Sequence, residues 1–185
     1  ASTLLPRVRL STSVRELVRS KSGWKVNGEE FDLAVSTLAL TDLPALVPDM
    51  PGAAAQAMRT LEYNGLLSIL LGLERREHPD LSWIYLPHAI QGPANRVTFM
   101  SNYSPHNAPK GKCSLLCEVT VRGGEKFPGA EVERQVVDGL AAAGLLRREE
   151  VLLTDRSEIR HAYVVFDHAY AARREAIFAW MDSVK

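Results

Sequence analysis

The middle of the chain gathers polar and aromatic side chains between short apolar runs. The set comprises Trp83, Tyr85, His88, Arg96, Asn102, Tyr103, His106 and Asn107. Alternation over residues 96–102 predicts a strand that carries Arg96, Thr98, Met100 and Asn102 on one face. The guanidinium fork of Arg96 could clamp a phosphate or carboxylate there, with tyrosine hydroxyls as further donors. The alternative, a face that is simply solvated, stays open from spacing alone.

Other reactive side chains indicate no second centre. Cys113 and Cys117 lie four positions apart in a strand-like run, roughly 13 Å from each other, whereas a disulfide requires Cα atoms within about 7 Å. We expect two buried free thiols and no metal site, because no histidine or second cysteine pair accompanies them. His161 and His168 flank an apolar run and are more typical of packing residues than of catalytic ones. No catalytic residue is identified.

Motifs and charge exclude several classes of function. The chain has no GxSxG, HExxH, ordered Ser-His-Asp set or glycine-rich phosphate loop, which disfavours a self-contained hydrolase or nucleotide site. Its 22 basic and 22 acidic residues cancel, so we expect no nucleic-acid partner. The longest apolar stretch, residues 65–73, is too short to cross a bilayer, and the first residues predict no signal peptide. We therefore expect a cytoplasmic protein with no membrane partner.

The elements that would position these residues suggest an α+β fold. The first forty residues read as a β-meander, with Asn27-Gly28 as a tight hairpin turn. Strands are expected over 7–10, 13–18, 24–26, 31–35, 66–73, 83–86, 96–102, 115–121, 151–154 and 159–166. Helices are expected over 52–61, 130–145 and 170–184, after a proline-containing connection at 41–51. We predict a meander domain, 1–40, and a second domain, 41–185, with an antiparallel or mixed sheet and covering helices.

Several runs in colinear order resemble one enzyme superfamily. They are Phe31-Asp-Leu-Ala-Val-Ser-Thr-Leu-Ala-Leu40, Trp83-Ile-Tyr-Leu-Pro87, Arg96-Val-Thr-Phe-Met-Ser-Asn-Tyr-Ser-Pro105, Asn107-Ala-Pro109 and Val165-Phe-Asp-His-Ala-Tyr170. The first is similar to the end of the flavin-binding meander in the amine oxidase and protoporphyrinogen oxidase superfamily. The others resemble the substrate side of eukaryotic-type UDP-galactopyranose mutases. That superfamily carries glycine-rich flavin motifs upstream of the meander and after the closing helix, and neither occurs here. We expect an internal piece of a flavoenzyme, with a truncated FAD-binding domain.

The resemblance implies roles for individual residues. It places the backbone of Val14 against the adenine of FAD, with Ser36 and Thr37 at the strand end that approaches the dinucleotide. It implies that Arg96 clamps the diphosphate of a sugar nucleotide. The implied set of substrate residues is Arg96, Tyr85, Tyr103, Asn102 and Tyr170. FAD is expected in the parent protein, and none is expected bound to this chain alone.

The resemblance also implies a function, with alternatives. It favours an FAD-dependent enzyme similar to UDP-galactopyranose mutase, which contracts the ring of a UDP-sugar. An oxidoreductase similar to amine oxidases or protoporphyrinogen oxidases is the enzymatic alternative, and a non-catalytic binding module is the third. The closing motif, His168-Ala-Tyr170-Ala, and His88 depart from the mutase pattern. Unpaired strand edges in the meander favour a homodimer through the N-terminal strands.

Overall fold

The structure, a computed structural model, describes residues 7–74 and 79–184. The chain falls into two compact units, which we call the terminal unit, Ala1–Leu61 with Val165–Lys185, and the sheet unit, Glu62–Val164. The predicted boundary at residue 40 lies inside the terminal unit. The N-terminal and C-terminal segments belong to one unit because a helix from each of them packs against the other.

The terminal unit contains the expected β-meander in a shortened form. Strands β1 (Leu17–Arg19), β2 (Trp24–Val26) and β3 (Glu29–Phe31) pair in antiparallel order. Asn27 and Gly28 have φ values of 51° and 85°, as the predicted hairpin turn requires. The strand predicted over 7–10 is wrong, and the strand predicted over 31–35 stops at Phe31. Among the described residues, no strand pairs with residues 7–10 or 32–35.

Two helices from opposite ends of the chain close the terminal unit. A 3₁₀ helix, η2 (Leu40–Ala45), lies in the predicted proline-containing connection and precedes α1 (Gly52–Arg59). Helix α1 buries Met58 and packs with α3 (Tyr170–Ser183), which buries Ile177. Asp167 accepts two hydrogen bonds from Arg173 and one from the Ala169 N–H, and so fixes the start of α3.

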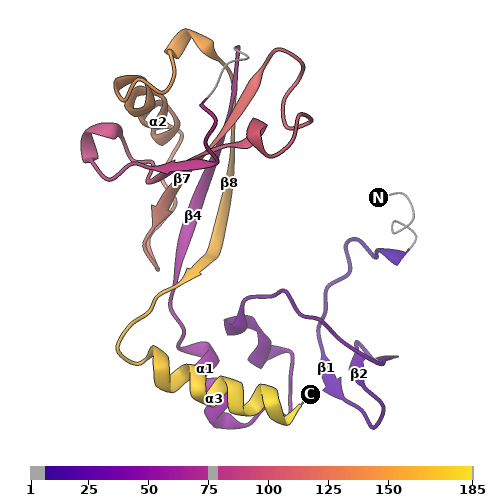
Figure 1. The fold of residues 1–185 in the computed structure, drawn as a ribbon. Coiled ribbons are helices and arrows are strands. Elements are labelled where there is room, and N and C mark those ends of the chain that lie inside the picture. The colour runs from indigo at the N-terminus through magenta and orange to yellow at the C-terminus, as the bar shows by residue number, and fades with distance from the viewer. Residues whose placement is uncertain (1–6, 75–78, 185) are drawn as a thin grey trace. The chain divides into compact units, whose positions relative to one another are not determined.

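The sheet unit is built on five antiparallel strands. In spatial order they are β5 (Trp83–Tyr85), β6 (Arg96–Phe99), β7 (Cys113–Val121), β4 (Tyr63–Leu73) and β8 (Val151–Val164). Long strands β4 and β8 run side by side in Figure 1. Two strands were predicted where β8 is continuous. The charged residues 155–158 looked like a connection, but they pair with β4 at the edge of the sheet and alternate between its faces.

One face of this sheet carries the core. Helix α2 (Glu131–Ala142) covers it and contributes Val132, Val136 and Leu140, as its spacing predicts. The sheet contributes alternate residues: Leu67, Ile69, Leu71, Leu73, Val97, Phe99, Cys113, Leu115, Cys117, Val119 and Val121. The short helix η3 (Ala89–Gln91) reaches α2 at Gly139, where a Cβ atom would lie 2.2 Å from the Gln91 carbonyl oxygen.

Strand β6 ends earlier than predicted. After Phe99 the chain enters a 3₁₀ helix, η4 (Met100–Asn102), and Asn102 Nδ2 donates to the carbonyl oxygens of Pro79 and Leu81 at 2.8 and 2.7 Å. Met100 and Asn102 therefore do not continue the face that Arg96 and Thr98 share. The last 3₁₀ helix, η5 (Arg148–Glu150), leads into β8.

Candidate functional site

The candidate site lies on the sheet face turned away from α2, which we call the distal face. Strand register aligns its residues in rows across all five strands. One row runs Tyr85, Arg96, Glu118, Ser68 and Ser157. The adjacent row runs Trp83, Thr98, Leu116, Leu70 and Asp155. Because residues in a row are direct cross-strand neighbours, the first row brings a cation, a carboxylate and hydroxyl groups together.

An ion pair occupies the centre of the first row. Arg96 Nη2 donates to Glu118 Oε1 at 2.5 Å, and Arg96 Nε faces the second oxygen, Oε2, as a close ionic contact rather than an aligned hydrogen bond. The Glu118 side chain is only 8% exposed, and that of Arg96 is 28% exposed. The hydrogen bond to Glu118 raises the pKa of Arg96, against the opposing effect of burial. Arg96 therefore stays charged, and the ion pair sets its charge against the Glu118 carboxylate.

Two tyrosines flank this ion pair. Arg96 Nη2 lies 3.3 Å from the Tyr163 hydroxyl, and a hydrogen bond with Tyr85 also raises the pKa of Arg96. The two phenol side chains come from opposite edges of the sheet, β5 and β8, and both are about half exposed or more. Tyr85 and Arg96 are direct neighbours in the β5–β6 register and therefore share a face.

The distal face is not electropositive. Besides the two rows above, strand register adds Thr120, Leu66 and Ile159 on one side and Ser114, Gly72 and Leu153 on the other. The charged side chains that the structure describes in these four rows are Arg96, Glu118 and Asp155. They sum to one cation and two carboxylates, so a bound anion would meet a net negative surface.

Neither cysteine is a nucleophile in this fold. Cys113 and Cys117 lie in β7 on the core face, and both are buried and free, as expected. Burial raises the pKa of the Cys117 thiol to about 12, and the charge of the neighbouring Glu118 acts in the same direction. A thiol with so high a pKa remains protonated at neutral pH and is unreactive.

The other predicted substrate residues do not join Arg96 in the described structure. Asn102 uses its side-chain amide to anchor η4 to the preceding loop, as described above. Tyr103, 55% exposed, ends η4, and no contact with Arg96 is recorded for it within the described residues. Tyr170 begins α3 in the terminal unit and packs edge-on against Phe166, with the ring centroids 4.6 Å apart. Their roles in substrate binding stay predictions.

The implied cofactor residues, Val14, Ser36 and Thr37, lie in the terminal unit. None of the three lines the cavity of about 520 Å³ that is formed beside Val14. Its lining includes Ser13, Arg15 and Asn27. Asn27 Oδ1 accepts from the Arg15 and Glu16 N–H groups at 2.7 and 3.2 Å, and its Nδ2 donates to the Ser13 carbonyl at 2.9 Å. Asn27 thereby satisfies the backbone on both sides of Val14.

Val14 itself keeps both backbone polar groups available. Within residues 7–74 and 79–184, no hydrogen bond involves its N–H or its carbonyl oxygen. This donor and acceptor match the edge of an adenine ring, so the residue fits its implied role. Ser36 and Thr37 follow the meander and are exposed, and the Ser36 Oγ accepts the Leu38 N–H at 3.4 Å.

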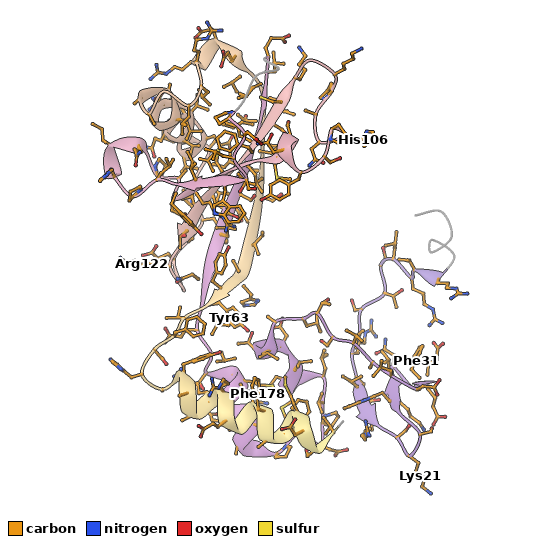
Figure 2. All side chains as sticks on the ribbon, viewed as in Figure 1. Lys21, Phe31, Tyr63, His106, Arg122 and Phe178 are labelled. Carbon is orange, nitrogen blue, oxygen red and sulfur yellow. The ribbon has the colours of Figure 1, made fainter. Side chains whose placement is uncertain are left out.

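A second cavity, of about 870 Å³, lies in the loop between η4 and β7. Its lining includes His106, Lys110 and Lys112. His106 projects from this loop in Figure 2. Lys112 forms an ion pair with Glu74, and Asn107 Nδ2 donates to the Met100 carbonyl at 2.8 Å. These contacts stabilise the loop, which accounts for the polar residues found there in the sequence.

Three residues of these sites were not identified as site residues from the sequence. In the sequence, Glu118 is a single carboxylate with no visible partner, Tyr163 belongs to no motif, and Asn27 indicates only a turn. A carboxylate inside an apolar strand requires a buried partner, and that requirement was the available signal for Glu118. The partner itself is set by strand register, which the sequence alone does not give.

The fold is shared with solved structures of low sequence identity. A crystal structure of reduced UDP-galactopyranose mutase superposes with a TM-score of 0.74 and 20% identity, over 92% of this chain and 39% of that one. A putative protoporphyrinogen oxidase from Exiguobacterium sp. 255-15 superposes with a TM-score of 0.62 and 15% identity, over 95% of this chain and 40% of that one. A CLA-producing fatty acid isomerase from P. acnes superposes with a TM-score of 0.53 and 11% identity, over 90% of this chain and 39% of that one. The chain thus spans about two fifths of each of these proteins.

Sequence comparison gives the family. Residues 2–163 match the family of flavin-containing amine oxidoreductases, and the chain belongs to that family. No curated protein matches the chain in sequence. Among the described residues, none of the helices combines the length and apolar character needed to cross a membrane.

Proposed function

We propose that this chain forms the substrate-binding part of an FAD-dependent oxidoreductase, with the distal face lining the substrate site. The observation that carries the proposal is the Arg96–Glu118 ion pair flanked by Tyr85 and Tyr163. Such a row presents fixed hydrogen-bonding groups beside aromatic surface, the combination typical of small-molecule sites. Membership of a flavin-containing family supports the assignment of the chemistry to a flavin.

The residues of this chain would bind and orient, and the flavin would supply hydride transfer when bound. The tyrosine hydroxyls offer neutral donors that can align a substrate oxygen or nitrogen without adding charge. Trp83, 49% exposed in the adjacent row, offers a flat apolar surface for stacking. The N–H and carbonyl of Val14 would read the adenine edge of FAD, since neither group has a hydrogen-bond partner among the described residues.

The test uses the complete protein that contains this chain, loaded with FAD. Candidate amines and other oxidisable organic substrates are added without oxygen, and loss of the visible absorbance of oxidised flavin reports hydride transfer from the substrate to the flavin. Tyr85→Phe should slow this reduction, whereas Tyr63→Phe, at the end of β4, should leave it unchanged. Equal rates of flavin reduction in both variants would show that the distal face does not line the substrate site.

The 185-residue chain alone offers a second measurement. Its sequence holds no glycine-rich turn for the flavin pyrophosphate, and Val14 supplies only one donor and one acceptor. We expect the purified chain to be colourless and to remain so after incubation with FAD and desalting. Retained flavin absorbance would show that the described residues bind the cofactor without such a turn.

A mutase similar to UDP-galactopyranose mutase is the second candidate. Two observations favour it: Arg96 and Tyr85 share the distal face, and the fold superposes on such a mutase with a TM-score of 0.74. In this case Arg96 contacts the diphosphate of a UDP-sugar, and Arg96→Ala should weaken UDP binding by about 1.5–3 kcal/mol. Titration calorimetry of the complete protein with UDP decides, because absence of binding to the unsubstituted protein would leave only the oxidoreductase.

A further inference from the structure

We propose that Glu118 determines the charge specificity of the distal face: it holds and neutralises Arg96, and so prevents Arg96 from binding a free phosphate or diphosphate. The proposal rests on the proposed function only for the location of the substrate site. It concerns which chemical groups this face accepts, and it can be measured without a flavin.

The position of Glu118 makes it a permanent partner of Arg96. The two residues are direct neighbours in the β6–β7 register, so their side chains leave the sheet together. Glu118 is nearly inaccessible to water and cannot be satisfied by solvent. A buried carboxylate that lost its cation would be strongly destabilised, so the pair has no low-energy open state.

The contacts of the guanidinium engage its Nε–Nη2 fork with Glu118 and one N–H of its Nη1–Nη2 fork with Tyr163. Bidentate recognition of phosphate uses two parallel N–H groups on one edge of the guanidinium. The edge formed by Nε and Nη2 faces the Glu118 carboxylate, and Nη2 also lies 3.3 Å from the Tyr163 hydroxyl. A phosphate would have to displace the carboxylate from this edge.

The surrounding charges oppose an anion as well. Asp155 lies in the adjacent row of the distal face, two strands beyond Glu118. The remaining polar groups in the two central rows are uncharged: the hydroxyls of Tyr85, Thr98, Ser68 and Ser157 and the indole N–H of Trp83. Hydroxyl groups and a neutralised ion pair accept uncharged hydrogen-bonding groups, whereas a phosphate needs uncompensated positive charge.

The experiment measures binding of inorganic pyrophosphate to the 185-residue chain by titration calorimetry at low salt. We expect no saturable binding for the unsubstituted chain or for Arg96→Gln. Glu118→Gln keeps the side-chain volume and releases the charge of Arg96, so it should bind pyrophosphate at least tenfold more tightly. The double variant Arg96→Gln/Glu118→Gln should lose this gain. Glu131→Gln, which frees the exposed Arg134 from one partner, controls for a general increase in positive charge.

Two results would overturn the proposal. The first is pyrophosphate binding by the unsubstituted chain that Arg96→Gln abolishes. The second is a folded Glu118→Gln variant, judged by circular dichroism, that gains no Arg96-dependent binding. If Glu118→Gln does not fold, comparison of the unsubstituted chain with Arg96→Gln still decides through the first criterion. Neither result touches the flavin-reduction assay, so failure of this proposal and failure of the proposed oxidoreductase are distinguishable.

Discussion

Removing the cation of the central ion pair should destabilise the sheet unit strongly. Arg96→Met keeps much of the side-chain length but leaves the Glu118 carboxylate, 8% exposed, without its cation. Removal of one partner from a fully buried pair costs about 3–5 kcal/mol. Because the Arg96 side chain is 28% exposed, water can partly replace it, and we expect a loss of about 2–3 kcal/mol in the free energy of unfolding.

The double variant Arg96→Met/Glu118→Leu sharpens this prediction. With both charges replaced by apolar groups, no buried carboxylate is left unpaired, and stability should return to within about 1 kcal/mol of the unsubstituted chain. Arg134→Met is the matched control, because Arg134 and its partner Glu131 are both mostly exposed, and we expect no measurable change.

Urea denaturation followed by tryptophan fluorescence is the assay. Of the three tryptophans, only Trp83 belongs to the sheet unit, so a background with Trp24→Phe and Trp180→Phe reports unfolding of that unit alone. The reasoning fails if Arg96→Met is no more destabilising than Arg134→Met. It also fails if the double variant is as unstable as the single one.

Three further predictions concern other parts of the chain. Hydrogen bonds from Arg173 lower the pKa of Asp167. The ionised Asp167 therefore stabilises the folded chain above the ordinary pKa of this carboxyl, and this contribution is lost as the pH falls through the lower pKa of the folded state. Asp167→Asn should therefore reduce stability to urea at about pH 7 and match the unsubstituted chain at about pH 2, and an equal deficit at both pH values would contradict this. Asn27→Gly keeps the positive φ but removes three side-chain hydrogen bonds, so amide hydrogen exchange should accelerate at residues 15 and 16 while the β2–β3 amides stay protected. Unchanged exchange at these two residues would exclude the role of Asn27. Gly139→Ala forces a Cβ against a backbone carbonyl of η3 and should lower the free energy of unfolding by about 1–3 kcal/mol, measured by thermal or urea unfolding. Gly129→Ala, with open space around it, should be neutral. Similar values for the two variants would show that η3 moves aside.

Local signals in the sequence predicted the elements that depend on local interactions. The Asn27-Gly28 turn requires positive φ at both positions, and these two residue types provide it at little cost. Helix α2 follows from apolar residues at helical spacing and ends before Gly144, which has the left-handed φ of 72° expected after a helix. The end of β6 was not predictable in this way, because it depends on hydrogen bonds from Asn102 to a distant loop.

The candidate site was predictable only in part, for a related reason. Alternation along β6 correctly placed Arg96 and Thr98 on one face and buried Val97 and Phe99 on the other. The partners of Arg96 come from residues 22 and 67 positions further along the chain. Their proximity is a property of strand order and register. A sequence pattern can therefore show that an arginine lies on a face, but not whether its charge is free.

The state of that charge connects stability with binding at this site. If Arg96 mainly neutralises a buried carboxylate, Arg96→Met should lose stability and leave pyrophosphate binding absent, as in the unsubstituted chain. Glu118→Gln should do the opposite, because an amide needs no counter-charge: it should retain more stability and gain the anion. An arginine that serves mainly as a phosphate clamp gives another pattern: the unsubstituted chain binds pyrophosphate, and Arg96→Met loses this binding. Measuring both quantities on both variants thus separates an arginine that supports the sheet from one that binds a diphosphate, and with it the two candidate chemistries of the distal face.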